Sequence, residues 1–132
     1  MFVLDNSVVT GWYLEDQATD YSEAIATRLE TERAVVPALW QLEFANVLKT
    51  ACTRGKLEIE TARQIIDAIG ALPIETDRDT PGPRQLFELA MRHNLSSFDA
   101  AYLELALRRG LPIACRDEKL QEAARAAGVT VA

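Results

Sequence analysis

The chain has 132 residues, a length that fits one domain, and 48% of them are hydrophobic, which is enough for a full core. Its formal net charge of −6 argues against a protein that coats nucleic acid by general electrostatics, though not against an enzyme that acts on nucleic acid through bound cations. No apolar run approaches the ~20 residues that a membrane-spanning helix needs. The start of the chain lacks the basic region of a secretory signal, and the two cysteines, Cys52 and Cys115, are interpreted as reduced thiols. We therefore expect a single cytoplasmic domain over residues 1–132.

Strands and helices are expected to alternate along the whole chain. Short apolar runs predict strands at 2–4, 34–36, 113–115 and 129–131, and residues 73–75 predict a weak strand at the edge of the sheet. Apolar residues at helical spacing predict helices at 8–13, 21–31, 38–53, 59–69, 84–93, 100–109 and 120–127. Short apolar strands without polar alternation suit a parallel sheet that is covered by helices on both faces, so the fold class expected is α/β.

Four acidic residues, Asp5, Glu43, Asp99 and Asp117, lie at the ends of predicted elements or in apolar surroundings. Asp5 and Asp117 follow predicted strands, Asp99 opens a predicted helix, and Glu43 lies inside an otherwise apolar helix. A carboxylate in an apolar setting is costly unless it is paired, hydrogen-bonded or bound to a metal. Because sites in parallel sheets form at the carboxyl ends of the strands, the fold is expected to bring all four acids near one edge.

Carboxylates are the oxygen ligands that Mg²⁺ and Mn²⁺ prefer, and several of them converging on one point can support metal-assisted hydrolysis of phosphodiester bonds. Each acid also has a purely structural explanation. Asp5 and Asp99 are suitable helix caps, Asp117 suits the first turn of a helix, and Glu43 could face solvent. The four acids together predict a divalent metal site more strongly than any one of them alone.

Four ordered segments of the sequence resemble motifs of PIN-domain ribonucleases of the VapC toxin type. Residues 2–7 are similar to the family's opening Asp-x-Ser motif, and residues 37–48 to its motif of a Glu inside an apolar helix that is entered through Pro. Residues 95–102 resemble the third motif, in which Ser or Thr precedes Asp-Ala-x-Tyr. Residues 114–120 are similar to the fourth, although Cys115 stands where the family usually has Thr.

This resemblance implies a PIN-like three-layer fold with a central parallel sheet. It also implies a metal-dependent endoribonuclease toxin that hydrolyses RNA phosphodiester bonds, uses Mg²⁺ or Mn²⁺, is neutralised by a small antitoxin protein and forms a homodimer. By match with the motifs, the acids that bind metal and catalyse the reaction would be Asp5, Glu43, Asp99 and Asp117. We further expect a role in contacting the substrate or supporting these acids for Ser7, Asn46, Ser97 and Arg116.

Other interpretations stay open at the level of sequence. A phosphatase or receiver-like domain would use Asp5 as a phosphoryl acceptor, but Ser7 stands where such domains carry a second acid. A non-catalytic PIN-like interaction module is the other alternative. Tyr102 is interpreted as a packing residue. Basic residues at element ends are candidate phosphate contacts, and each of them is equally explained as solvated surface charge: Arg54, Lys56, Arg78, Arg84 and Arg116.

Overall fold

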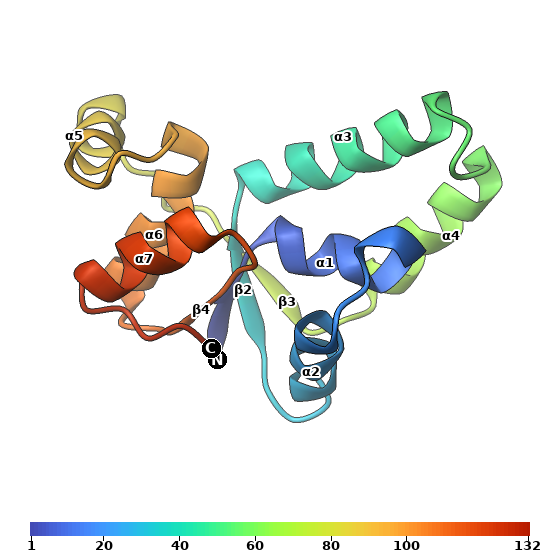
Figure 1. Ribbon diagram of the computed structural model, residues 1–132, viewed down its shortest axis with the longest axis horizontal. Coiled ribbons are helices and arrows are strands. Elements are labelled where there is room, and N and C mark those ends of the chain that lie inside the picture. Colours follow the sequence, from blue (N-terminus) through green and yellow to red (C-terminus); the bar gives the residue numbers. More distant parts are fainter.

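The computed structural model describes residues 1–132 as a four-stranded parallel sheet with helices on both sides (Figure 1). The strands β1 (Phe2–Leu4), β2 (Ala34–Pro37), β3 (Ile74–Asp77) and β4 (Ile113–Ala114) lie in the order β3-β2-β1-β4. Every neighbouring pair is parallel, and Val3 in the central strand β1 lies opposite both Val35 and Ile113. The predicted α/β class with a central parallel sheet is confirmed.

The helices are α1 (Asn6–Tyr13), α2 (Asp20–Arg28), α3 (Leu39–Thr53), α4 (Ile59–Gly70), α5 (Pro83–His93), α6 (Ser97–Arg109) and α7 (Glu118–Ala126), with a 3₁₀ turn η1 (Glu15–Gln17) after α1. Helices α1 to α4 lie on one side of the sheet and α5 to α7 on the other (Figure 1). This division follows from right-handed crossovers, because the chain moves from β1 through β2 to β3 in one direction and then returns to β4. None of the helices is both long enough and apolar enough to cross a lipid bilayer.

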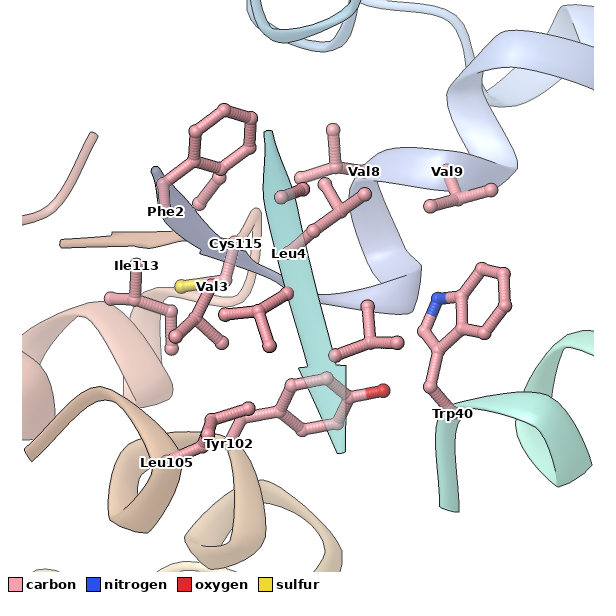
Figure 2. Close-up of a cluster of buried hydrophobic side chains, with 14 of the residues drawn as sticks. Phe2, Val3, Leu4, Val8, Val9, Trp40, Tyr102, Leu105, Ile113 and Cys115 are labelled. Atoms are coloured by element: carbon pink, nitrogen blue, oxygen red, sulfur yellow. The ribbon is translucent and has the colours of Figure 1, made fainter. Parts of the chain in front are cut away.

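The core is formed where the strands meet the helices on either side. Phe2, Val3 and Leu4 are fully buried, as expected for a strand that is covered on both faces. Figure 2 shows Tyr102 of α6 lying against this core with its hydroxyl directed toward the side of Trp40, at the start of α3. Because α3 begins just after β2 ends, this hydroxyl lies at the carboxyl edge of the sheet.

The strands expected at 34–36 and 113–115 end one residue later and one residue earlier, at Pro37 and Ala114, and two further predicted strands differ more. The strand expected at 129–131 is reduced to one bridge between Ile113 and Val131, because its neighbour β4 is only two residues long. The strand expected at 73–75 begins one residue later, as β3, and continues to Asp77. The carboxylate of Asp77 pairs with Arg108 of α6 at 3.1 Å, and this ion pair ties α6 to the end of the edge strand.

Candidate active site

The direction of the chain through the sheet reverses between β1 and β4. From β1 the following strands are added on one side, whereas β4 is added on the other. In parallel α/β sheets, ligands bind outside the carboxyl ends of the strands at such a reversal. Asp5 follows β1 directly and Asp117 follows β4 after two intervening residues, so the two acids lie on either side of this point.

Asp5 is a buried carboxylate that also caps a helix. The residue is 7% exposed, and one of its carboxylate oxygens accepts a hydrogen bond from the main-chain N–H of Ser7 at 3.2 Å, in the first turn of α1. Burial raises the pKa of Asp5 to about 6 against the opposing effect of the Ser7 hydrogen bonds, and the charges of Asp99 and Glu43 raise it further. Asp5 is therefore a helix cap, as one interpretation of the sequence holds. Its buried carboxylate also places a charge that is costly to bury at the edge of the sheet.

Glu43 is half-buried in α3 and is held by a tyrosine from the opposite side of the sheet. The hydroxyl of Tyr102, itself fully buried, donates a hydrogen bond to Oε1 of Glu43 at 2.5 Å. Burial raises the pKa of Glu43, the Tyr102 hydrogen bond lowers it, and the charge of Asp99 raises it. From the sequence alone, Tyr102 is interpreted only as a packing residue. Its position one helical turn after Asp99 was the available signal that its hydroxyl could reach the same site.

Asp99 lies in the first turn of α6 but does not cap it. The cap is Ser96, whose Oγ accepts a hydrogen bond from the main-chain N–H of Asp99 at 3.1 Å. Burial raises the pKa of Asp99, and the charge of Asp117 raises it further, while Ser96 and Lys119 lower it. Asp117 is the exposed member of the set and caps α7 by accepting from the N–H of Lys119 at 3.3 Å.

The four acids form a chain of like charges that no basic side chain neutralises by an ion pair. Asp5 interacts electrostatically with Glu43 and Asp99, Glu43 with Asp99, and Asp99 with Asp117. No three His, Cys, Asp or Glu side chains have the spacing of a formed metal cluster, so joint binding of one ion requires side-chain rotation. A set of oxygen donors that lacks a counter-charge nevertheless fits a hard divalent cation.

A further oxygen at this edge has no hydrogen-bond partner. Oδ1 of Asn6, the residue after Asp5, is buried and unpaired. Buried polar atoms of folded proteins are usually paired, and amide oxygens belong to the same class of hard donors as carboxylates. The unpaired Oδ1 atom is thus a second observation that agrees with a cation at this edge.

Ser7 and Arg116, both expected to contact the substrate or support the acids, join the end of β4 to α1. Oγ of Ser7 accepts a hydrogen bond from the main-chain N–H of Arg116 at 3.1 Å. The guanidinium of Arg116 donates to the main-chain oxygens of Ser7 at 3.4 Å and Gln17 at 2.5 Å. These bonds hold the segment that carries Asp117 against the segment that carries Asp5.

Asn46 and Ser97, the other two residues expected near the acids, are exposed. Asn46 lies one turn after Glu43 on α3. Ser97 is the first residue of α6, and the hydroxyl that caps this helix belongs to the preceding residue, Ser96. Contacts of Asn46 and Ser97 with a substrate stay a prediction.

Cys115, which stands where the resembling motif usually has Thr, is buried. Burial raises its pKa to about 12, and the negative charges of Asp5, Asp117 and Asp99 contribute in the same direction. The thiol is therefore neutral. Support for this segment comes instead from Gln121, whose Nε2 donates to the main-chain oxygen of Cys115 at 2.7 Å, a contact that the sequence did not predict. Both cysteines are free, as expected.

Comparison with characterised sequences identifies similar proteins. Two curated relatives, both named Ribonuclease VapC1, come from the CDC 1551/Oshkosh and H37Rv strains of Mycobacterium tuberculosis. Each is 32% identical over 89 residues, which is 66% of this chain and 65% of the relative. The similarity thus spans slightly less than two thirds of the length of these relatives.

Comparison with solved structures identifies similar folds. The crystal structure of PAE2754 from Pyrobaculum aerophilum matches with a TM-score of 0.68 at 20% identity and covers 92% of this chain and 84% of that one. The crystal structure of FitAcB from Neisseria gonorrhoeae matches with a TM-score of 0.62 at 19% identity, and the match covers 99% of this chain and 96% of that one. The sequence profile described as PIN domain matches residues 2–126, nearly the whole chain. The sheet order, the four acids at its carboxyl edge and this match together show that the chain belongs to the PIN domain family.

Proposed function

We propose that this protein is a metal-dependent endoribonuclease that hydrolyses RNA phosphodiester bonds at the carboxyl edge of its sheet. The observation that carries the proposal is that Asp5, Glu43, Asp99 and Asp117 lie near one another at the strand reversal of a PIN domain and form no ion pair with a basic side chain. The printed name of the curated relatives, a ribonuclease, supports the choice of RNA as substrate.

Different residues of the chain fix and orient the acids of this site. Asp5 and Asp117 are fixed by main-chain N–H groups at the first turns of α1 and α7, and Glu43 is oriented by Tyr102. The four acids would hold Mg²⁺ or Mn²⁺. When bound, such a cation lowers the pKa of water and neutralises charge that develops on phosphate oxygens. Since the pKa of Asp5 is about 6, its carboxyl is mostly ionised at neutral pH and is available as a ligand.

Cleavage of RNA by the purified protein tests the proposal. With Mg²⁺ or Mn²⁺ the wild type should cleave total RNA, and the chelator EDTA should stop the cleavage. Asp5→Asn and Asp99→Asn should lose activity by more than a hundredfold (on the order of 3 kcal/mol in the barrier) while keeping the circular dichroism spectrum of the wild type. The matched control is Asp67→Asn, which changes an exposed acid on α4 and should retain full activity. Metal-dependent cleavage by a purified Asp5→Asn variant would overturn the assignment.

We also propose that the protein is a toxin held inactive by a small antitoxin protein and that it forms a homodimer. Exposed apolar side chains support such partners: Leu42, Ile59 and Ile66 on α3 and α4, and Phe87 and Met91 on α5. Light scattering of the purified chain measures the oligomeric state, and a monomer at micromolar concentration would contradict the homodimer. Loss of RNA cleavage on adding the product of a small neighbouring gene would identify the antitoxin.

A further inference from the structure

A groove lies between α1 and α3, and its lining residue Asn46 follows Glu43 by one turn of α3. It encloses about 290 Å³. Its floor includes the apolar residues Leu14, Val47 and Ala51, and its polar lining consists of hydroxyl and amide side chains and two cations, among them Thr10, Asn46, Thr50, Arg54 and Lys56. None of its lining residues is acidic. The cavity between α5 and α6 differs, because Glu88 and Glu104 line it beside its arginines. In a chain of net charge −6, the lining of the α1/α3 groove thus carries two cations and no acid, while Asp16 pairs with Lys56 at its rim.

The groove runs away from the proposed metal ligands. Asp5 caps α1 and Glu43 lies near the start of α3, and the two helices extend in the same direction from the sheet edge (Figure 1). Along α3, Asn46, Thr50 and Arg54 follow Glu43 at intervals of three or four residues, which places all of them on one face of the helix. At 1.5 Å per residue, Arg54 lies about 16 Å along the helix axis from Glu43.

The side chains of the groove are free to contact a ligand. Arg54 is exposed and forms no ion pair or side-chain hydrogen bond. Lys56 pairs only with Asp16, at 3.1 Å, and both side chains are more than half exposed, so water competes for this pair. The hydroxyl of Thr10 donates to the main-chain oxygen of Ser7, which leaves its oxygen able to accept a further hydrogen bond.

We propose that this groove holds the sugar–phosphate backbone of single-stranded RNA as it leaves the acidic site, with Arg54 and Lys56 contacting phosphates and Thr10 accepting from a ribose hydroxyl. The inference rests on the proposed ribonuclease function. Basic side chains attract phosphate regardless of sequence, and hydroxyl and amide groups complete the contacts to ribose and phosphate. The groove therefore positions the RNA strand and does not read its bases.

An acidic segment of a protein is the competing ligand for a basic groove. RNA is favoured because Thr10 and Asn46, which line the groove, lie within two helical turns of Asp5 and Glu43, so that a strand held at the acids can continue into the groove. A strand bound there would pass from Asp5 and Glu43 to Arg54 without leaving the surface between α1 and α3. A protein ligand would have no need of this continuity.

Binding of a fluorescently labelled single-stranded RNA oligonucleotide tests the proposal. The measurement is made in the Asp5→Asn background, so that the RNA stays intact. Arg54→Glu should weaken affinity about tenfold and reduce the slope of log affinity against log salt by about 0.7, the value for one phosphate contact on a single strand. Arg92→Glu, which reverses an exposed charge on α5, is the matched control and should bind as the background protein does.

Asp16→Asn should increase the affinity for RNA, a result that misfolding of the variant would not produce. It releases Lys56 and removes a negative charge beside the groove, so RNA affinity should rise. This variant matters because Arg54 is the C-terminal cap of α3, and its reversal could loosen the helix end. Circular dichroism of Arg54→Glu and the milder Arg54→Gln checks for such loosening.

Kinetics with otherwise wild-type protein separate this inference from the ribonuclease assignment. Arg54→Glu should raise KM for a long RNA and leave kcat unchanged. Cleavage of a dinucleotide, which cannot reach Arg54, should be unaffected. Absence of cleavage by the wild type together with Arg54-dependent RNA binding would overturn the nuclease function and retain the groove. RNA affinity that is indifferent to Arg54 and Asp16 would overturn the groove. So would Arg54-dependent binding of poly-glutamate without binding of RNA, since the ligand would then be a protein.

Discussion

At the scale of single residues, Asp5 joins a stabilising contact to a destabilising charge. Its carboxylate caps α1 through the N–H of Ser7, a contact that typically stabilises a helix by about 1 kcal/mol. The same carboxylate is buried among other acids, and burial raises its pKa to about 6. Asparagine caps helices as well as aspartate does but carries no charge. Replacing Asp5 by asparagine therefore separates the two effects.

The pH dependence of stability follows from the raised pKa of Asp5. Protonation of a group whose pKa is higher in the folded state stabilises the fold at low pH, and this stabilisation is lost as pH rises from the ordinary pKa of 3.8 through about 6. For the metal-free protein the free energy of unfolding should fall over this range, by about 3 kcal/mol from Asp5 alone. Glu43 and Asp99, whose pKa values are also raised, act in the same direction.

Asp5→Asn should weaken this pH dependence and unfold at a higher temperature than the wild type at pH 7 in EDTA. Thermal unfolding followed by circular dichroism in a chelator, at several pH values across that range, is the measurement. A variant that is less stable than the wild type at neutral pH would show that the charge of Asp5 is compensated in a way the structure does not contain.

At the scale of secondary-structure elements, the strands and helices that could be predicted are those marked by a local pattern of apolar residues in the sequence. The strand at Phe2–Leu4 and the helix that became α3 follow from short apolar runs and helical periodicity. The contact between Tyr102 and Glu43 joins residues 59 positions apart, and that between Arg116 and Gln17 spans 99. Such contacts depend on the strand order, which periodicity does not encode. For this reason the acids and the supporting residues Ser7 and Arg116 could be named from the sequence, but not the contacts made by Tyr102 and Gln121.

The packing of α1 on α2 depends on the absence of a side chain at Gly11. A Cβ atom there would lie 2.6 Å from Oγ and 2.8 Å from Cβ of Ser22, which is fully buried. Ser22 forms a capping box with Thr19 at the start of α2, so it cannot move aside without breaking the cap. The close approach of the two helices also fixes the direction in which α1 leaves Asp5.

Gly11→Ala should therefore destabilise the protein by about 1–3 kcal/mol, the usual cost of forcing a methyl group into a packed interior. Gly70→Ala is the matched control, because a Cβ atom at the end of α4 meets nothing within 4 Å. That substitution should leave stability unchanged or raise it by up to about 1 kcal/mol, since alanine favours helix. Urea denaturation measures both variants. Equal stability of Gly11→Ala and the wild type would show that α2 can move away from α1 at little cost.

At the scale of the whole molecule, the fold concentrates negative charge at one edge of the sheet and forms no ion pair with it. The acids come from four separate parts of the chain, after β1, within α3, at the start of α6 and after β4. Their mutual repulsion opposes folding, because it exists only when these parts are brought together. A cation that binds the folded state and not the unfolded chain would relieve the repulsion and stabilise the whole domain.

Metal ions should consequently raise the unfolding temperature of the wild type. At a free Mn²⁺ concentration about 100 times its dissociation constant, the gain is about 2.7 kcal/mol. For a domain of 132 residues that corresponds to a rise of about 10 °C. EDTA should reverse the shift.

Without metal, Asp5→Asn should unfold at a higher temperature than the wild type. Added Mn²⁺ should raise the unfolding temperature of this variant only slightly, so the difference in unfolding temperature between the two proteins should shrink or change sign. The measurement is differential scanning calorimetry of both proteins with Mn²⁺ and with EDTA. An equal shift in both would show that the cation binds away from Asp5, and no shift in the wild type would show that the acidic edge does not bind it.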